Sequence, residues 1–174
     1  MLRTWTAIAA VLMSPAACPQ IPRTEAHRTM ANDLVSVIET IADKLTDADA
    51  SVRSLTQALG EVDRTYTGSG YYLKPQDRRL ETVWLGVSTG KPELPTDVEI
   101  TPRPKFQPTV GDLDAAFGQH TLMPMNPDGK RMRIRYVLTQ AKKPYTASIF
   151  ATLSANDEET STHITSVSIR RDAR

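Results

Sequence analysis

Residues 131–138 read Arg-Met-Arg-Ile-Arg-Tyr-Val-Leu, and this run is the strongest fold signal in the chain. Apolar residues and arginines alternate one by one along it, and a period of two places them on opposite faces of a β-strand. A strand with one apolar face and one charged face is typical of an antiparallel sheet that is covered on one side only. We therefore expect Arg131, Arg133 and Arg135 to form a row on the solvent-facing side of such a sheet.

Other segments predict the rest of the sheet. Residues 145–153 alternate in the same way, and a last strand is expected over residues 163–170. The run Gly68-Ser69-Gly70 predicts a turn between two β-prone arms. Those arms carry Tyr66, Tyr71 and Tyr72. A half-buried strand is expected over residues 79–87. Its alternation places Leu80, Thr82 and Trp84 on one face and Arg79, Glu81 and Val83 on the other.

Helical spacing appears in three places. Residues 32–45 predict an amphipathic helix, because apolar residues recur there at intervals of three and four. Shorter helices are expected over 51–59 and 109–117, each followed by a glycine that can end it, Gly60 and Gly118. Together with the strands, these helices predict an α+β fold in which short helices pack on an antiparallel sheet.

The two short helices also share a sequence pattern at a constant separation of 58 residues. Such a match favours two tandem helix–meander modules, although chance is the alternative, since any short helix shows this spacing. Trp84 and Tyr136 are expected in comparable places of the two copies. The modules would span residues 30–88 and 109–174, with a proline-rich linker at 89–108. The matched residues are Val52 and Val110, Leu55 and Leu113, Leu59 and Phe117, and Gly60 and Gly118.

The amino-terminal residues differ in kind from the rest. Residues 1–17 contain one positive charge, then a short apolar run, then small residues, which is the layout of a secretory signal peptide. We expect Cys18 to be lipidated and residues 18–29 to form a tether, although Pro15 departs from the usual lipobox. Cleavage by the ordinary signal peptidase after Ala16 or Ala17, or a buried cytosolic helix, are the alternatives.

Composition limits the function classes. The chain has 174 residues, with 21 Lys and Arg against 20 Asp and Glu, so no bulk charge favours nucleic acid as a partner. One cysteine excludes an intramolecular disulfide, and three scattered histidines favour neither a metal site nor a catalytic triad. We therefore expect no cofactor, no metal site, no catalytic residues and no enzyme activity. Acidic residues predominate over 32–73 and basic residues over 119–150.

A short helix that ends in Leu-Gly or Phe-Gly before a meander resembles the group of bacterial envelope lipoproteins that contains BamE and the tandem-module β-lactamase inhibitor proteins. The resemblance covers at most residues 47–171. It implies an α+β fold and a binding role on the periplasmic side of the outer membrane, or otherwise in the soluble periplasm. The runs Leu59-Gly60-Glu61-Val62 and Phe117-Gly118-Gln119-His120 lack the proline common in that group. No site residue transfers with the resemblance.

Two sets of residues are candidates for binding a partner protein. Arginine forks suit carboxylate or phosphate groups and are enriched at interfaces, which favours Arg131, Arg133 and Arg135, although a solvated outer face is the alternative. The tyrosines Tyr66, Tyr71 and Tyr72 form a second candidate surface, unless the rings pack onto the core. The partner would be an envelope protein that this chain helps to assemble, or a periplasmic enzyme that it inhibits or confers immunity to. An envelope hydrolase acting on cell-wall polymers is the alternative from another class.

Overall fold

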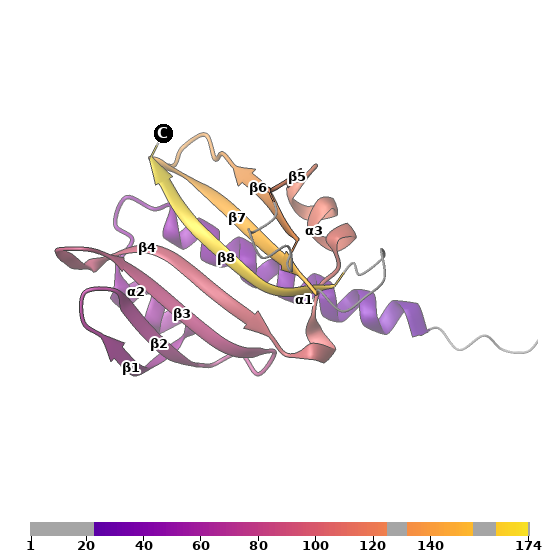
Figure 1. Ribbon diagram of the computed structural model, residues 1–174, viewed down its shortest axis with the longest axis horizontal. Helices are drawn as coiled ribbons and strands as arrows, with labels where there is room; N and C mark the ends of the chain where they lie inside the picture. Colours follow the sequence, from indigo (N-terminus) through magenta and orange to yellow (C-terminus); the bar gives the residue numbers. More distant parts are fainter. Residues whose placement is uncertain (1–22, 125–131, 155–162, 174) are drawn as a thin grey trace, which may run out of the picture.

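One antiparallel sheet joins the two halves of the chain. The computed structural model describes residues 23–124, 132–154 and 163–173, and within them eight strands pair in the order β1-β2-β3-β4-β8-β7-β6-β5 (Figure 1). The predicted α+β class is confirmed. The strands are β1 (Gly60–Tyr66), β2 (Gly70–Pro75), β3 (Leu80–Ser88), β4 (Lys91–Pro102), β5 (Thr121–Leu122), β6 (Arg133–Leu138), β7 (Tyr145–Leu153) and β8 (Ile164–Ala173). The helices are α1 (Arg23–Leu45), α2 (Val52–Leu59) and α3 (Val110–Phe117), with a 3-10 turn η1 (Pro104–Phe106).

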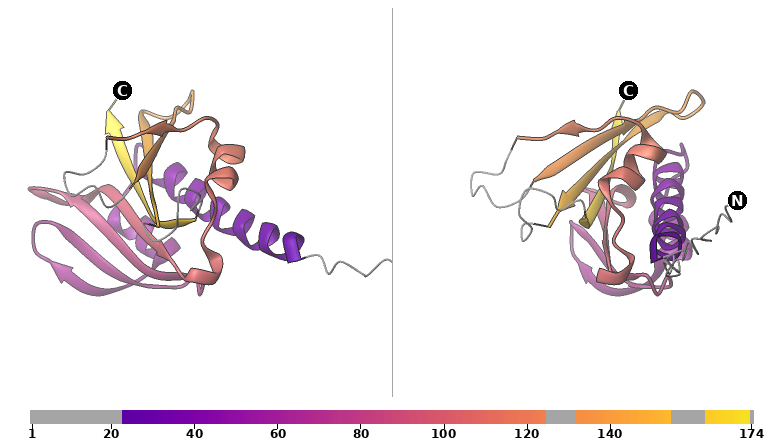
Figure 2. Two further views of the ribbon diagram at one scale, coloured as in Figure 1. Left: turned by 45° about the vertical axis from the view of Figure 1, so that its right-hand side comes forward. Right: turned by 90° about the vertical axis from the view of Figure 1, so that its right-hand side faces the viewer.

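Helix α1 covers one face of this sheet and crosses the boundary between the halves. It contacts the central strands β4 and β8 as well as α2 and α3. Figure 1 shows α1 passing behind the strands, and the right-hand view of Figure 2 shows it on one side of the sheet. The core between helix and sheet includes Leu34, Ile38, Ile41, Leu45, Val83, Val98, Ile100, Ile149, Val167 and Ile169.

The helices α2 and α3 begin with the same local device. The Ser51 hydroxyl accepts from the Ser54 backbone N–H and the Ser54 hydroxyl accepts from the Ser51 backbone N–H, which closes a capping box. Thr109 and Asp112 form the equivalent box at α3. Both predicted short helices are thus confirmed. Each half consists of a capped helix followed by four antiparallel strands, and the strand order of one half mirrors that of the other.

The linker predicted at residues 89–108 is wrong for most of its length, because Lys91–Pro102 forms β4 in the middle of the sheet. Pro95 and Pro102 lie at register shifts of the β3–β4 pairing, where a missing backbone N–H interrupts no regular ladder. Residues 97–100 between them contain no proline and pair with both β3 and β8. The spacing of the prolines, rather than their number, therefore permits a central strand.

The alternation expected in β3 is also corrected. A register shift between Leu80 and Thr82 forms a bulge, and one extra residue turns the rest of the strand over. Val83 therefore lies on the core face together with Leu80, and Trp84 lies on the opposite face. Tyr136 is on β6, with its side chain in the core. Trp84 and Tyr136 consequently do not hold comparable places.

Helix α1 starts earlier than expected. It begins at Arg23, so residues 23–29 of the predicted tether are helical, and the helix predicted from residue 32 is longer at its amino end. The sequence after Pro22 contains no glycine or proline up to Leu45, so no residue there breaks the helical backbone. The predicted signal peptide and Cys18 lie outside the described residues. Among the helices of the described part, none combines the length and apolarity needed to span a membrane.

We expect Gly60→Ala to lower the free energy of unfolding by about 3 kcal/mol, because strain and a clash act together. Gly60 has a φ of 144°, and a Cβ there would lie 2.0 Å from the carbonyl oxygen of Lys74. The matched control is Gly118→Ala in the other half, where φ is 82° and no atom lies within 4 Å of the new Cβ. Its expected loss is about 1 kcal/mol. Urea unfolding measures both, and equal losses would contradict the steric account.

Candidate functional site

The face of the sheet opposite α1, called the open face below, is covered by no described helix. Antiparallel residues directly opposite each other project to the same side, so the strand register shows which side chains share this face. One row crosses six strands at a single level. It pairs Tyr72 with Trp84, Trp84 with Glu99, Glu99 with Ser168, Ser168 with Phe150, and Phe150 with Arg135. Figure 1 looks onto this face.

An aromatic cluster occupies the first half of the open face. The ring centres of Tyr66 and Tyr72 lie 5.7 and 4.9 Å from that of Trp84, and 5.6 Å from each other. These distances and tilted geometries are those of favourable aromatic pairs. The rings border a hollow of about 390 Å³, called the aromatic hollow below. It is lined by Tyr66, Tyr72, Thr82, Trp84, Glu99 and Thr101.

Three guanidinium groups surround one ring in the other half of the open face. Those of Arg133, Arg135 and Arg170 lie 5.4, 5.6 and 5.3 Å from the ring centre of Phe150, within the range of cation–π attraction. We call these four residues the arginine cluster. A flat ring between three like charges keeps the guanidinium groups apart while stabilising each of them. Arg133 and Arg135, which the alternating pattern predicted on one face, thus lie beside a third arginine, Arg170 of β8.

Hydrogen bonds fix part of the arginine cluster. The Nη2 of Arg135 donates to the Ser148 hydroxyl over 2.9 Å, and the Nε of Arg170 donates to the Asp172 carboxylate over 2.8 Å. The Ser148 hydroxyl donates to the same carboxylate. Burial raises the pKa of Asp172, but the bonds from Ser148 and Arg170 and the nearby charge of Arg135 outweigh it, so the pKa lies below its usual value.

The predicted binding residues divide between the two faces. Arg133 and Arg135 lie together on the open face, and so do Tyr66 and Tyr72. Tyr71 does not, because it is opposite Leu85 and packs half-buried against the core. The expectation of one surface with all three tyrosines is therefore corrected, since neighbours on a strand project to opposite sides. Arg131 and Cys18 lie outside the described residues.

Three further residues of the open face were not predicted from the sequence, namely Trp84, Phe150 and Arg170. Trp84 was hidden by the bulge in β3, which changes the side of the sheet that it faces. Phe150 follows Ile149, a core residue, so strict alternation already placed it on the charged side of β7. Arg170 joins the cluster because β8 pairs with β7, so that Arg170 stands opposite Ser148. No local sequence pattern predicts this pairing.

A second group of polar side chains lies at the end of α3. The Asp114 carboxylate accepts from the Tyr136 hydroxyl over 2.9 Å, and the same oxygen lies 2.8 Å from Nδ1 of His120. Burial, and then the bond to Asp114, raise the pKa of Tyr136 above its usual range. Phe117 stacks edge-on against the same tyrosine. This contact anchors α3 on β6.

In the described residues no group of three His, Cys, Asp or Glu side chains is arranged to hold a metal ion.

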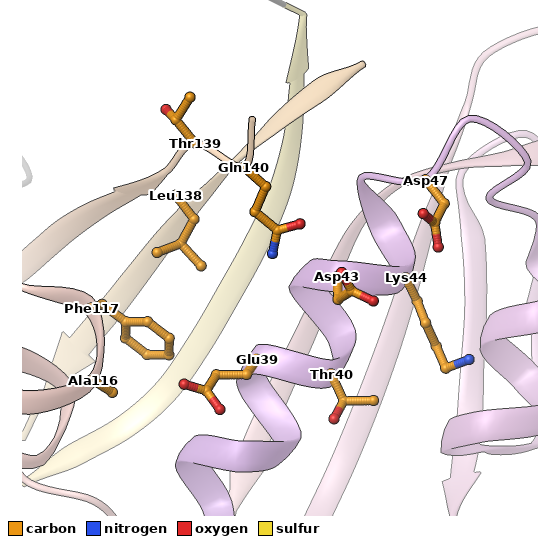
Figure 3. A pocket seen from close by; sticks show the side chains of 10 residues that line it. All are labelled: Glu39, Thr40, Asp43, Lys44, Asp47, Ala116, Phe117, Leu138, Thr139 and Gln140. Carbon is orange, nitrogen blue, oxygen red and sulfur yellow. The ribbon is translucent and has the colours of Figure 1, made fainter. Parts of the chain in front are cut away.

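A groove of about 550 Å³ lies on the other side of the sheet, between α1, α3 and the end of β6 (Figure 3). Figure 3 shows Glu39 pointing toward Phe117, whereas Lys44 points away from it. Lys143 forms ion pairs with Asp43 and Asp47, and these bonds raise the pKa of Lys143. Two carboxylates of the groove are therefore already paired with one ammonium group, and this contact holds the β6–β7 connection on α1. The open face is the better candidate site.

The hydrogen bonds of Asp172 make stability depend on pH in a definite direction. Because the pKa of Asp172 is lowered on folding, the carboxylate stabilises the folded state above its ordinary pKa of 3.8, and the effect is lost as pH falls through the lowered value. We expect Asp172→Asn to lower the free energy of unfolding at neutral pH by about 1.5 kcal/mol. The deficit should shrink below pH 3.8.

Chemical unfolding of both proteins from neutral to strongly acidic pH measures this. The control is Asp63→Asn, since the side chain of Asp63 is 54% exposed and forms only a surface ion pair with Arg64. A deficit of the same size at every pH would contradict the role assigned to the Asp172 charge.

Comparison with known proteins adds no relative to this description. No protein-family model matches the chain, no curated protein matches it, and no solved structure matches it. The resemblance to the BamE group and to the β-lactamase inhibitor proteins stays a prediction from the sequence. The role of the open face is therefore argued from its own residues.

Proposed function

We propose that this protein is a bacterial cell-envelope lipoprotein that acts by binding a partner protein through the open face, and not as an enzyme. The observation that carries the proposal is the composition of that face, which offers an aromatic hollow at one end and an arginine cluster at the other. Trp, Tyr and Arg are the residue types most enriched among interface residues that dominate binding energy. Tyr66 and Tyr72 are 46% and 40% exposed to solvent. A face that contacts only water does not need large exposed rings, so their exposure favours a binding surface.

The partner is an envelope protein or a periplasmic enzyme. In the first role the chain is an assembly subunit that contacts several components, and in the second it is an inhibitor or immunity protein that forms a tight complex with one enzyme. Both roles use the same face, so they differ in the number of partners and not in the residues involved. No nucleic acid partner, cofactor or metal belongs to the proposal.

The proposed anchor is a lipid on Cys18, which would hold the protein on the periplasmic side of the outer membrane. Small residues before this cysteine, after a charged and then apolar segment, support the proposal. Without lipidation, cleavage after Ala16 or Ala17 would place the same domain in the soluble periplasm. Helix α1 begins at Arg23, shortly after Cys18, so a lipid anchor would keep the domain close to the membrane.

Intact-mass analysis of protein recovered from membranes tests the anchor. We expect the wild type to start at an acylated Cys18, and the Cys18→Ala variant to lose the acyl mass and leave the membrane fraction. Unmodified protein cut after Ala16 or Ala17 would make it a soluble periplasmic protein. A chain that retains Met1 would overturn the proposed compartment.

Crosslinking in intact cells, followed by identification of the joined proteins, tests the open face. We expect Trp84→Ala and Arg135→Glu each to reduce a defined crosslink on the order of tenfold, since each removes an interface residue of the energetically dominant types. The control is Arg53→Glu, the same charge change on the exposed side of α2. Circular dichroism checks that the variants remain folded.

Equal loss of the crosslink in the Arg53→Glu control would contradict binding through the open face. One enzyme recovered in a 1:1 complex would identify an inhibitor, and several envelope proteins would identify an assembly subunit. Turnover of cell-wall polymers by the purified protein would instead support the alternative of an envelope hydrolase.

A further inference from the structure

The arginine cluster carries more positive charge than its surroundings balance. The cluster contains three guanidinium groups. Among the described residues, Asp172 is the carboxylate that is hydrogen-bonded to this cluster. Two further acids of the open face, Asp97 and Glu99, lie on β4, and Asp97 stands opposite Arg170 in the strand pairing. The Asp97 carboxylate lies over Gly86 on β3, in the space that a Cβ at residue 86 would occupy. The cluster therefore keeps an excess positive charge.

The guanidinium groups are also short of hydrogen-bond acceptors. The Nε atoms of Arg133 and Arg135 are buried and have no acceptor in the described part of the chain. The side chain of Arg133 makes no hydrogen bond or ion pair to any described residue, and its guanidinium group lies over the ring of Phe150. A carboxylate offers two oxygens in a geometry that matches a guanidinium fork, and the nearby ring lowers the local dielectric for that pairing.

The aromatic hollow has the opposite chemistry. Its walls are three rings and two threonines, and Glu99 is the acid on its border. A hollow of about 390 Å³ lies in the volume range of binding pockets, and its lining combines ring faces with the polar groups of Thr82, Glu99 and Thr101. Glu99 repels carboxylates from this end of the face, so an acidic ligand group has to lie at the arginine cluster.

The register fixes the separation of these two subsites. Trp84 on β3 and Phe150 on β7 occupy the same row, and Glu99 and Ser168 stand between them. Three strand-to-strand steps separate them, which amounts to about 14 Å at the usual spacing. An extended segment crosses that distance in about four residues. Ser168 in the middle is small and leaves room for the chain of a ligand to pass.

We infer that the open face holds one acidic segment of a partner protein at two subsites, with an apolar side chain in the aromatic hollow and a carboxylate about four residues away on the arginine cluster. This inference rests on the proposed function, because it specifies what the open face binds. Charge complementarity and the aromatic hollow on the same row favour a protein segment over a lipid surface, which would satisfy only the arginines.

A random linear peptide library displayed on phage tests the inference, with selection on the wild-type protein and counter-selection on Trp84→Ala. We expect enrichment of sequences with an aromatic or aliphatic residue four positions from Asp or Glu. The best peptide is then synthesised, together with an amide form in which its acid is replaced by Gln or Asn. Calorimetry gives the Kd of each form for the wild type and variants.

We expect Arg133→Gln and Arg135→Gln each to weaken the acidic peptide about tenfold and the amide peptide less than twofold, since a charge-assisted pair is lost only with the acid. Arg133→Gln is the variant less prone to misfold, because the side chain of Arg133 makes no hydrogen bond within the described residues. Trp84→Ala should weaken both peptides alike. Arg53→Gln on α2, the same loss of charge away from the open face, should change neither.

The outcomes separate this inference from the proposed function. Peptides that depend on Trp84 but are indifferent to the arginines would overturn the two-subsite inference and leave the open face as a binding surface. Enriched peptides that ignore Trp84 and the arginines, or no enrichment at all, would overturn both. Arginine-dependent binding to phosphatidylglycerol vesicles without peptide binding would assign the cluster to a membrane surface and also overturn the inference.

Discussion

The pairing of β4 with β8 is the constraint on which the rest of the molecule depends. On the core side it sets Val98 opposite Ile169 and Ile100 opposite Val167, all four fully buried beneath α1. Without this seam each half would be a separate small sheet with a helix, and these four side chains would lose their partners across the seam. Helix α1 reinforces the seam because it contacts both central strands.

The seam also produces the open face. The halves mirror each other about β4 and β8, so their third strands, β3 and β7, stand at equal distances from the centre. These strands carry Trp84 and Phe150, the aromatic residues around which the hollow and the arginine cluster form. Similar strand orders thus present different chemistry at corresponding places, aromatic in one half and cationic in the other. A single surface therefore has two chemically different ends on two similarly ordered halves of the sheet.

Much of the fold could be predicted because its signals are local. The strand at Arg133–Leu138, the strand at Tyr145–Leu153 and both capped helices follow from side-chain period and cap residues within short windows. The central strand β4 could not be predicted in this way, since its prolines resemble those of a linker until the pairing places them at register shifts. Half of the candidate site likewise could not be predicted from local sequence patterns. The bulge that exposes Trp84 and the register that brings Arg170 to Phe150 are properties of strands distant in sequence.

The position of β8 in the sheet has a consequence for how the protein is made. Among the described strands β8 comes last in the sequence, yet it lies between β4 and β7, so the sheet remains divided into two parts with facing open edges until β8 pairs. Contacts between such distant segments form slowly, and unpaired edges invite aggregation in the meantime. A polypeptide that emerges amino end first, from a ribosome or across a membrane, therefore cannot complete its architecture while β8 is still missing. Removing β8 would cut the sheet through its middle, whereas trimming an outer strand such as β5 would only narrow it.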